Sequence, residues 1–363
     1  MNFRSDNESP ISPAILAAIE KANIGMAYSY GEDLISQRLL ARFSELFEHE
    51  VEVFPVATGT AANALAISQL TPVYGSVFCH EMAHLYSDEC GAPEFFTGGA
   101  KIVPLSGELA KIDIETLEDV MGGVGDLGVH ETQASAVSIS QSTELGAIYK
   151  VHEVQQLAKI AHSKGLGFHM DGARFANVIQ SLGCTPAEMT WKAGVDILSF
   201  GATKNGALAA EAVIVFNQDR VQGLDRRHKR AGHLFSKMRY ISAQLETYIK
   251  DGLWLELAAH ANKAADALSK GFYKLSQYSP VEVLYPVEVN EIFVKLPESV
   301  AKGLKSRGYE FHHWPGTRDI YRLVTSFFTD LKDVQEILSA TKELCDLKNT
   351  DEASVSYPIL SIL

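Results

Sequence analysis

Cysteines and positive charges are scarce in this sequence of 363 residues, and each shortage argues against a class of protein. The cysteines number four: Cys79, Cys90, Cys184 and Cys345. Because no two of them stand in a C-x-x-C spacing, we expect reduced thiols of a cytoplasmic protein rather than a disulfide scaffold. Cys79 lies near His80 and His84, but no second pair of ligands follows, so we expect no metal site.

Positive charge is outnumbered by negative charge. Lysine and arginine number 32 against 45 aspartates and glutamates, which gives a formal net charge of −13. This balance argues against a nucleic-acid partner, since phosphate backbones attract positive surfaces. No apolar run approaches the roughly 20 residues that span a bilayer, and residues 1–6 lack the features of an export signal. We expect a cytoplasmic protein with no nucleic-acid or membrane partner.

The fingerprints of nucleotide-binding folds are also missing. The sequence contains neither G-x-x-x-x-G-K-[ST] nor G-x-G-x-x-G. Short apolar segments nevertheless alternate with helical patterns, such as those at 60–69 and 151–163, which is typical of a mostly parallel α/β sheet. The seven predicted strands cover residues 51–56, 76–79, 101–104, 134–140, 167–170, 195–200 and 211–216.

The character of the chain changes near residue 226. A basic stretch at 226–230 precedes a helical pattern that extends to Tyr273. Two further strands are predicted at 289–296 and 321–325, with helices at 299–307 and 331–347. We therefore predict a large domain over residues 1–250, which includes an N-terminal arm, and a small α+β domain over residues 251–363.

Two residues in the large domain suggest a chemistry. Asp171 ends a short apolar strand, and Lys204 follows another after a glycine. Ligands of α/β sheets bind at the carboxyl ends of the strands. A lysine that forms a Schiff base with an aldehyde and a carboxylate that keeps a pyridine nitrogen protonated are what pyridoxal 5′-phosphate chemistry requires. The pair predicts this cofactor, with Lys204 as the covalent partner.

Two other segments fit the same ligand. Gly59 and Thr60 lie where a predicted strand runs into a helix, so a phosphate there would meet free backbone N–H groups. The alternative for this motif alone is a threonine-capped helix. His84 follows another short strand, and its imidazole is placed to stack on a flat ring or to move a proton. His80 competes for that role.

Taken together, these segments resemble the low-specificity L-threonine aldolases, which have the fold-type-I architecture of aspartate-aminotransferase-like, pyridoxal phosphate-dependent enzymes. The segments that carry the resemblance are Phe3–Asn7, Tyr30–Asp33, Thr58–Asn63, His84 with Glu89–Ala92, Met170–Arg174, Ser199–Lys204 and Arg322–Ser326. They occur in the family's order and span nearly the whole chain. The resemblance implies a pyridoxal phosphate-dependent transferase-like fold and cleavage of L-threonine, L-allo-threonine or related β-hydroxy-α-amino acids to glycine and an aldehyde.

The resemblance also assigns roles to single residues. Lys204, Asp171 and His84 would be catalytic, and Arg174 would contact both the cofactor and the substrate. Ser5 and Arg322 would hold the substrate carboxylate, Arg322 through a two-pronged contact.

The family completes its phosphate site with basic residues of a neighbouring subunit. The candidates for that contact here are Lys229, Arg230 and Arg239. This implies a homo-oligomer, and we expect a homotetramer built as a dimer of dimers.

One departure from the family bears on the reaction. Where many members have an Asn-Thr-His run, this chain reads Ser-Ile-Ser-Gln-Ser-Thr-Glu-Leu-Gly over residues 138–146, without a histidine. His84, a water molecule or Gln141 would then supply the polar contact to the substrate. Two alternatives stay open at this stage: a β-eliminating lyase or other fold relative acting on a different amino acid, and a non-catalytic, cofactor-binding regulatory protein.

Overall fold

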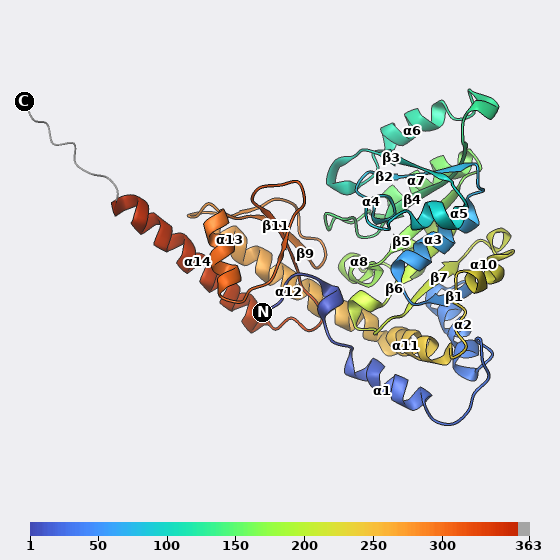
Figure 1. The fold of residues 1–363 in the computed structure, drawn as a ribbon, viewed down its shortest axis with the longest axis horizontal. Coiled ribbons are helices and arrows are strands. Elements are labelled where there is room, and N and C mark those ends of the chain that lie inside the picture. The colour runs from blue at the N-terminus through green and yellow to red at the C-terminus, as the bar shows by residue number, and fades with distance from the viewer. Residues whose placement is uncertain (355–363) are drawn as a thin grey trace, which may run out of the picture.

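The computed structural model describes residues 1–354 of the chain, which form two β-sheets with helices packed around them (Figure 1). Of the helices, α1 to α12 surround or adjoin the large sheet, and α12 to α14 adjoin the small one. The helices are α1 (Pro13–Ala22), α2 (Leu34–Phe47), α3 (Gly59–Leu70), α4 (His84–Ser87), α5 (Ala92–Thr97), α6 (Ile114–Gly122), α7 (Val151–Ser163), α8 (Phe175–Leu182), α9 (Pro186–Met189), α10 (Leu224–Arg230), α11 (Arg239–Ile249), α12 (Leu253–Leu275), α13 (Glu298–Ser306) and α14 (Leu331–Ser354).

The large sheet has seven strands in the order β1-β7-β6-β5-β4-β2-β3. Its strands are β1 (Glu52–Val56), β2 (Gly75–His80), β3 (Lys101–Leu105), β4 (Gln133–Ser140), β5 (Gly167–Gly172), β6 (Ile197–Gly201) and β7 (Glu211–Val215). All neighbouring pairs from β6 to β3 are parallel, and only β7 runs against both of its neighbours. The predicted mostly parallel seven-stranded sheet is confirmed.

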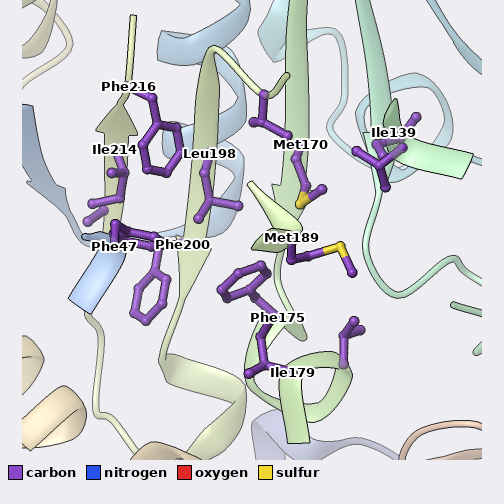
Figure 2. Close-up of a cluster of buried hydrophobic side chains, with 14 of the residues drawn as sticks. Phe47, Ile139, Met170, Phe175, Ile179, Met189, Leu198, Phe200, Ile214 and Phe216 are labelled. Atoms are coloured by element: carbon purple, nitrogen blue, oxygen red, sulfur yellow. The ribbon is translucent and has the colours of Figure 1, made fainter. Parts of the chain in front are cut away.

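Both faces of this sheet are covered, which explains why its central strands read as continuous apolar runs rather than as alternating ones. On one face, Leu198 and Phe200 of β6 pack with Phe47 of α2 and Phe175 of α8 (Figure 2). The ring of Phe200 lies 6.1 Å from that of Phe175, edge to face. On the other face, Ile197 packs in a cluster with small side chains of α3, which let this helix approach the sheet closely.

The small sheet is antiparallel, in the order β10-β11-β9-β8. Its strands are β8 (Glu282–Val283), β9 (Glu291–Lys295), β10 (His312–His313) and β11 (Ile320–Val324). Helices α12, α13 and α14 contribute to its core. The N-terminal arm joins it as well: Phe3 is buried in that core and its carbonyl accepts a hydrogen bond from the Val324 N–H at 2.8 Å.

Helix α12 connects the two cores. Trp254 and Ala258 near its start belong to the core of the large sheet, whereas Leu268 and Phe272 near its end belong to that of the small sheet (Figure 1). The division of the chain at residue 250 stays a prediction.

The basic stretch at 226–230 lies in α10, and the helical pattern predicted from its end to Tyr273 is two helices, α11 and α12, rather than one. Between α10 and α11, Gly232 has a positive φ of 79°, and between α11 and α12 the positive values are 53° at Asp251 and 77° at Gly252. A right-handed helix cannot continue through such residues. The apolar periodicity continues across the breaks because α10, α11 and α12 all pack their apolar faces against the rest of the protein.

Candidate active site

The predicted site residues Asp171 and Lys204 lie at the carboxyl ends of two adjacent strands. Asp171 is in β5, which pairs in parallel with β6, and Lys204 follows β6 in a 3₁₀ turn over Thr203–Asn205. Gly201 brings the two loops together, since a Cβ at this position would lie 2.7 Å from the carbonyl oxygen of Ala173. Only glycine fits this approach, so the loop of Lys204 is held against the loop that follows Asp171.

The carboxylate of Asp171 is buried and held by two donors. Its Oδ2 accepts a hydrogen bond from Nδ2 of Asn63 at 2.8 Å, and its Oδ1 accepts one from the backbone N–H of Ala173 at 3.0 Å. The residue is only 7% exposed. Asn63 is on α3, so the carboxylate is fixed between the sheet and this helix.

The same asparagine connects Asp171 to His84. Its Nδ2 also donates to Oε1 of Glu89 at 2.8 Å, and that oxygen lies 2.9 Å from Nδ1 of His84. The hydrogen bond to Glu89 raises the pKa of His84; burial opposes the shift, and the negative charge of Asp171 adds to it. Burial raises the pKa of the Glu89 carboxyl. The imidazole is therefore anchored at Nδ1, while 43% of its side chain stays exposed.

The segment that carries Lys204 is held by a buried glutamate. Glu211 of β7 accepts hydrogen bonds from the backbone N–H groups of Ala202 at 3.1 Å and Thr203 at 3.3 Å. Burial raises the pKa of Glu211 to about 7, although these donors and the nearby Lys204 lower it. The charge of Lys204 also acts on Asp6 and on His84, where it favours the ionised carboxyl of Asp6 and opposes protonation of His84.

Two arginines meet at one buried glutamate beside these residues. Nη1 of Arg174 lies 3.1 Å from Oε2 of Glu291, and Nη1 of Arg322 lies 3.5 Å from its Oε1. Arg174 also makes a two-pronged contact with Asp6, at 2.8 and 3.1 Å. The negative charges of Asp6 and Glu291 outweigh burial and raise the pKa of Arg174. Nε of Arg322, by contrast, is buried without a hydrogen-bond partner among the described residues.

Two predicted contacts are not provided by this geometry. Gln141 is fully buried, and its amide binds the backbone N–H and carbonyl of Tyr149 at 3.0 and 2.8 Å, so it is not available to a substrate. We correct that assignment: its polar side chain replaces backbone pairing just beyond β4. The competing His80 is likewise engaged, with one nitrogen 3.1 Å from the Gly107 carbonyl and the other accepting the Met82 N–H at 3.0 Å.

Other predicted contacts have local partners. Ser5 caps a 3₁₀ turn by accepting the Asn7 N–H at 3.2 Å. At the start of α3 the capping residue is Thr58 rather than Thr60, with its hydroxyl accepting the Ala61 N–H at 3.2 Å. The N–H groups of Gly59 and Thr60 have no protein acceptor in the described part of the chain, as a phosphate site requires.

The three basic candidates for the phosphate lie outside the network around Asp171. Lys229 and Arg230 are exposed at the end of α10, and the ammonium group of Lys229 lies 4.4 Å from the centre of the Tyr30 ring. Arg239 begins α11; one of its Nη atoms donates to Tyr240 at 3.3 Å, and its buried Nε has no partner among the described residues. No contact in the described part of the chain supports a role for them within one subunit.

For several polar residues of the site, the sequence predicted no role. They are Asp6, Asn63, Glu89, Glu144, Glu211 and Glu291. Some of them stand within the segments that carry the family resemblance, but no pattern indicates their partners. Glu211 and Glu291 carried a usable signal: each is a charged residue at the start of an apolar strand, where a buried carboxylate needs partners.

The residues present fit the cofactor that the sequence predicts. Among the described side chains, none makes an ion pair or hydrogen bond with Lys204, so its amine is available to an aldehyde. Asp171 offers a buried carboxylate for a pyridine nitrogen, His84 offers a partly exposed ring, and α3 offers two free N–H groups for a phosphate. Among the described residues, no group of three histidine, cysteine, aspartate or glutamate side chains is arranged to hold a metal ion.

Comparison with known proteins agrees with this geometry. The family described as beta-eliminating lyase matches residues 2–299. The chain belongs to this family. It is 42% identical to the low specificity L-threonine aldolase of Pseudomonas sp. (strain NCIMB 10558) over 335 residues, which covers 92% of this chain and 95% of that protein. The low specificity L-threonine aldolase of Pseudomonas aeruginosa is 40% identical over the same shares.

A solved structure supports the same assignment. The threonine aldolase of Leishmania major superposes with a TM-score of 0.88 at 26% identity, covering 95% of this chain and 99% of that one. The resemblance to the low-specificity L-threonine aldolases and the fold-type-I architecture are thus confirmed. The protein is an enzyme of the lyase class. The roles predicted for single residues stay predictions.

Proposed function

We propose that the protein is a pyridoxal phosphate-dependent aldolase that cleaves L-threonine, L-allo-threonine or related β-hydroxy-α-amino acids to glycine and an aldehyde. The observation that carries the proposal is the position of Asp171 and Lys204 on adjacent strand ends, beside two arginines suited to a carboxylate. The relatives that are 42% and 40% identical are low specificity L-threonine aldolases, which supports the same reaction for this site.

When bound, pyridoxal phosphate supplies an electron sink for the bond that breaks. The residues of the chain would divide the remaining work. Lys204 would hold the cofactor covalently through its amine and later return a proton. Asp171, fixed by Asn63 and Ala173, would keep a proton on the pyridine nitrogen. His84, anchored by Glu89, would lie over the ring.

The substrate carboxylate would bind Arg322 rather than Arg174. Each nitrogen of the Arg174 guanidinium already faces a carboxylate of Asp6 or Glu291. Arg322 has a buried Nε without a partner and only a long contact of 3.5 Å to Glu291. A two-pronged contact with the substrate carboxylate would orient the Cα–Cβ bond for cleavage. The orientation of the bound substrate would thereby determine which bond breaks. Ser5 stays a candidate for a second contact.

The phosphate would be completed by a second copy of the chain, in a homo-oligomer for which a tetramer built as a dimer of dimers is our proposal. The segment between α1 and α2 exposes Ile24, Met26 and Tyr28, the last at 78%. Exposed apolar side chains gathered in one segment are typical of protein–protein interfaces. Lys229 contacts Tyr30 of this segment, so the basic candidates adjoin the same surface.

We also propose that the protein acts in the cytoplasm, because Cys79, Cys90 and Cys184 form no disulfide. Within residues 1–354, none of the helices has the length and apolar character needed to cross a membrane.

The proposed activity is tested by mixing the purified holoenzyme with L-threonine, L-allo-threonine and phenylserine and assaying the aldehyde. Release of glycine and aldehyde in equal amounts is expected. Release of a keto acid and ammonia from serine, without aldehyde, would instead indicate a β-eliminating lyase. Bound cofactor with no turnover of any of these amino acids would indicate a regulatory protein.

A further inference from the structure

Glu144, just beyond the end of β4, has a carboxyl group that is held on one side only. Its Oε1 accepts hydrogen bonds from the Ser140 hydroxyl at 2.6 Å and from the backbone N–H of His84 at 3.0 Å. Its Oε2 is buried and has no hydrogen-bond partner among the described residues. The carboxyl is thus fixed in direction, with one oxygen left for another molecule.

No cation neutralises this carboxyl in the part of the chain that the structure describes. The groups that face it from the surrounding elements are Asp171 of β5, Cys79 of β2, and Tyr149, His84 and Arg174 of the adjoining segments. Arg174 is committed to Asp6 and Glu291. Burying a carboxyl with one oxygen unpaired and no cation beside it is costly, so a purely structural role is not what this arrangement favours.

We propose that Glu144 is the catalytic base that takes the proton from the β-hydroxyl group of the substrate, through its free Oε2. The inference rests on the proposed aldolase function and names a residue for the role that the missing histidine leaves open. The hydroxyl proton moves to Oε2, and the electron pair of the O–H bond forms the carbonyl of the aldehyde. The electron pair of the Cα–Cβ bond goes to the sink that the cofactor supplies. A proton then returns to Cα, so that none is gained or lost overall.

The other candidates are less suited to this step. His84 has a raised pKa because of its hydrogen bond to Glu89, which favours the form already carrying protons on both nitrogens. Gln141 is engaged by the backbone of Tyr149. Burial raises the pKa of Glu144 to about 7, against the lowering effect of Ser140 and the backbone donors. A base whose pKa lies near the working pH is the most effective one.

The test separates the step at the hydroxyl from the rest of the reaction. In Glu144→Gln the shape is kept, but the amide cannot accept the proton. We expect aldehyde release from phenylserine and L-threonine to fall by about 10²–10⁴-fold. The exchange of the glycine Cα proton with deuterated water, which involves no hydroxyl, should stay within about threefold of the wild type, because proton transfer at Cα needs no β-hydroxyl base. Glu81→Gln, which removes an exposed carboxylate just before His84, is the matched control and should change neither rate.

A second measurement does not depend on turnover. Difference infrared spectra of the purified protein against Glu144→Gln, recorded without substrate, should show one carboxyl that titrates with a midpoint near pH 7. The wild-type kcat for cleavage should rise with pH through the same range, because only the ionised carboxylate accepts a proton. Should Glu144→Gln fail to fold, Glu144→Asp replaces it, and cleavage should fall while glycine exchange persists.

The outcomes are distinct. Equal loss of cleavage and exchange, or cleavage within about threefold of the wild type, overturns the role of Glu144 while leaving the aldolase function in place. A wild type that releases no aldehyde from any β-hydroxy amino acid overturns both. Loss of cleavage alone, with the carboxyl titration present, supports the proposal.

Discussion

Oε2 of Glu291 lies 3.1 Å from Nη1 of Arg174, and the other oxygen of the same carboxylate is the nearest acid to Arg322. Glu291 is 2% exposed and neither of its oxygens makes a regular hydrogen bond. Its charge therefore depends on the two guanidinium groups. The contact gives the arginines different tasks: Arg174 is locked by Asp6 and Glu291, and Arg322 remains the group that an incoming anion can take over.

Replacing Arg322 should weaken substrate binding and leave the cofactor in place. We expect Arg322→Ala to raise KM for L-threonine by about 10–100-fold, because a charge-assisted hydrogen bond contributes about 1.5–3 kcal/mol. Arg322→Lys keeps the charge but loses the planar fork, so its KM should lie between those of the wild type and the alanine variant. Steady-state kinetics together with cofactor absorbance measure both effects. Loss of cofactor in Arg322→Ala would place this arginine at the phosphate instead.

Lys204→Ala should abolish turnover and leave the cofactor bound only non-covalently, because no other amine adjoins Asp171 in the described site. Reduction of the wild-type holoenzyme with borohydride, followed by digestion and mass spectrometry, should place the pyridoxyl label on the peptide that contains Lys204. A label on a different lysine would contradict the assignment.

Asp171→Asn should fold normally and lose at least about a hundredfold in kcat, which corresponds to about 2.7 kcal/mol of transition-state stabilisation. The amide cannot hold a proton on the pyridine nitrogen. It also turns a donor toward Nδ2 of Asn63, which now donates to Asp171 at 2.8 Å. Near-native activity in Asp171→Asn with bound cofactor would refute the electrostatic role.

The basic candidates should act on the cofactor phosphate from a second subunit. Alanine variants of Lys229, Arg230 and Arg239 are compared by cofactor content after gel filtration, and we expect at least one to lose cofactor because the overall charge of −13 repels a dianion. Arg226→Ala, another exposed residue of the same helix, is the control and should retain cofactor. Multi-angle light scattering on the same samples reports the oligomer. If all three variants hold cofactor like the wild type, the phosphate is bound within one chain.

Buried His169 should make the protein sensitive to acid. Its nitrogens lie 2.8 Å from the hydroxyl of Ser138 and 3.0 Å from that of Ser199, and burial lowers its pKa from 6.5 to about 4. The unfolded chain therefore binds the proton more tightly, and the stabilisation present above pH 6.5 is lost as the pH falls toward 4. The loss amounts to about 3 kcal/mol. In His169→Gln the free energy of unfolding, measured in urea at several pH values, should fall less steeply over this range; an equal slope would refute the effect.

The parts of this protein that the sequence determines are those that depend on local pattern. The strand from Gly167, the helix over Val151–Ser163 and the glycine before the Lys204 loop follow from apolar runs, spacing and the need for close approach. Their order along the chain specifies a mostly parallel sheet, and with it the strand ends where Asp171 and Lys204 meet. This is why the chemistry of the cofactor was predictable.

Only the tertiary structure decided which polar groups are left over. Gln141 and Glu144 stand three residues apart after the same strand, yet one amide is consumed by the backbone of Tyr149 and one carboxyl oxygen remains free. Likewise, the sequence does not show which of Arg174 and Arg322 is free to bind a substrate. The structure does, because Arg174 is paired with both buried Asp6 and buried Glu291, whereas Arg322 has only the long contact to Glu291. Asp6 and Glu291 stand more than 100 positions from Arg174 along the chain, and the desolvation of all these groups depends on packing that no local pattern contains.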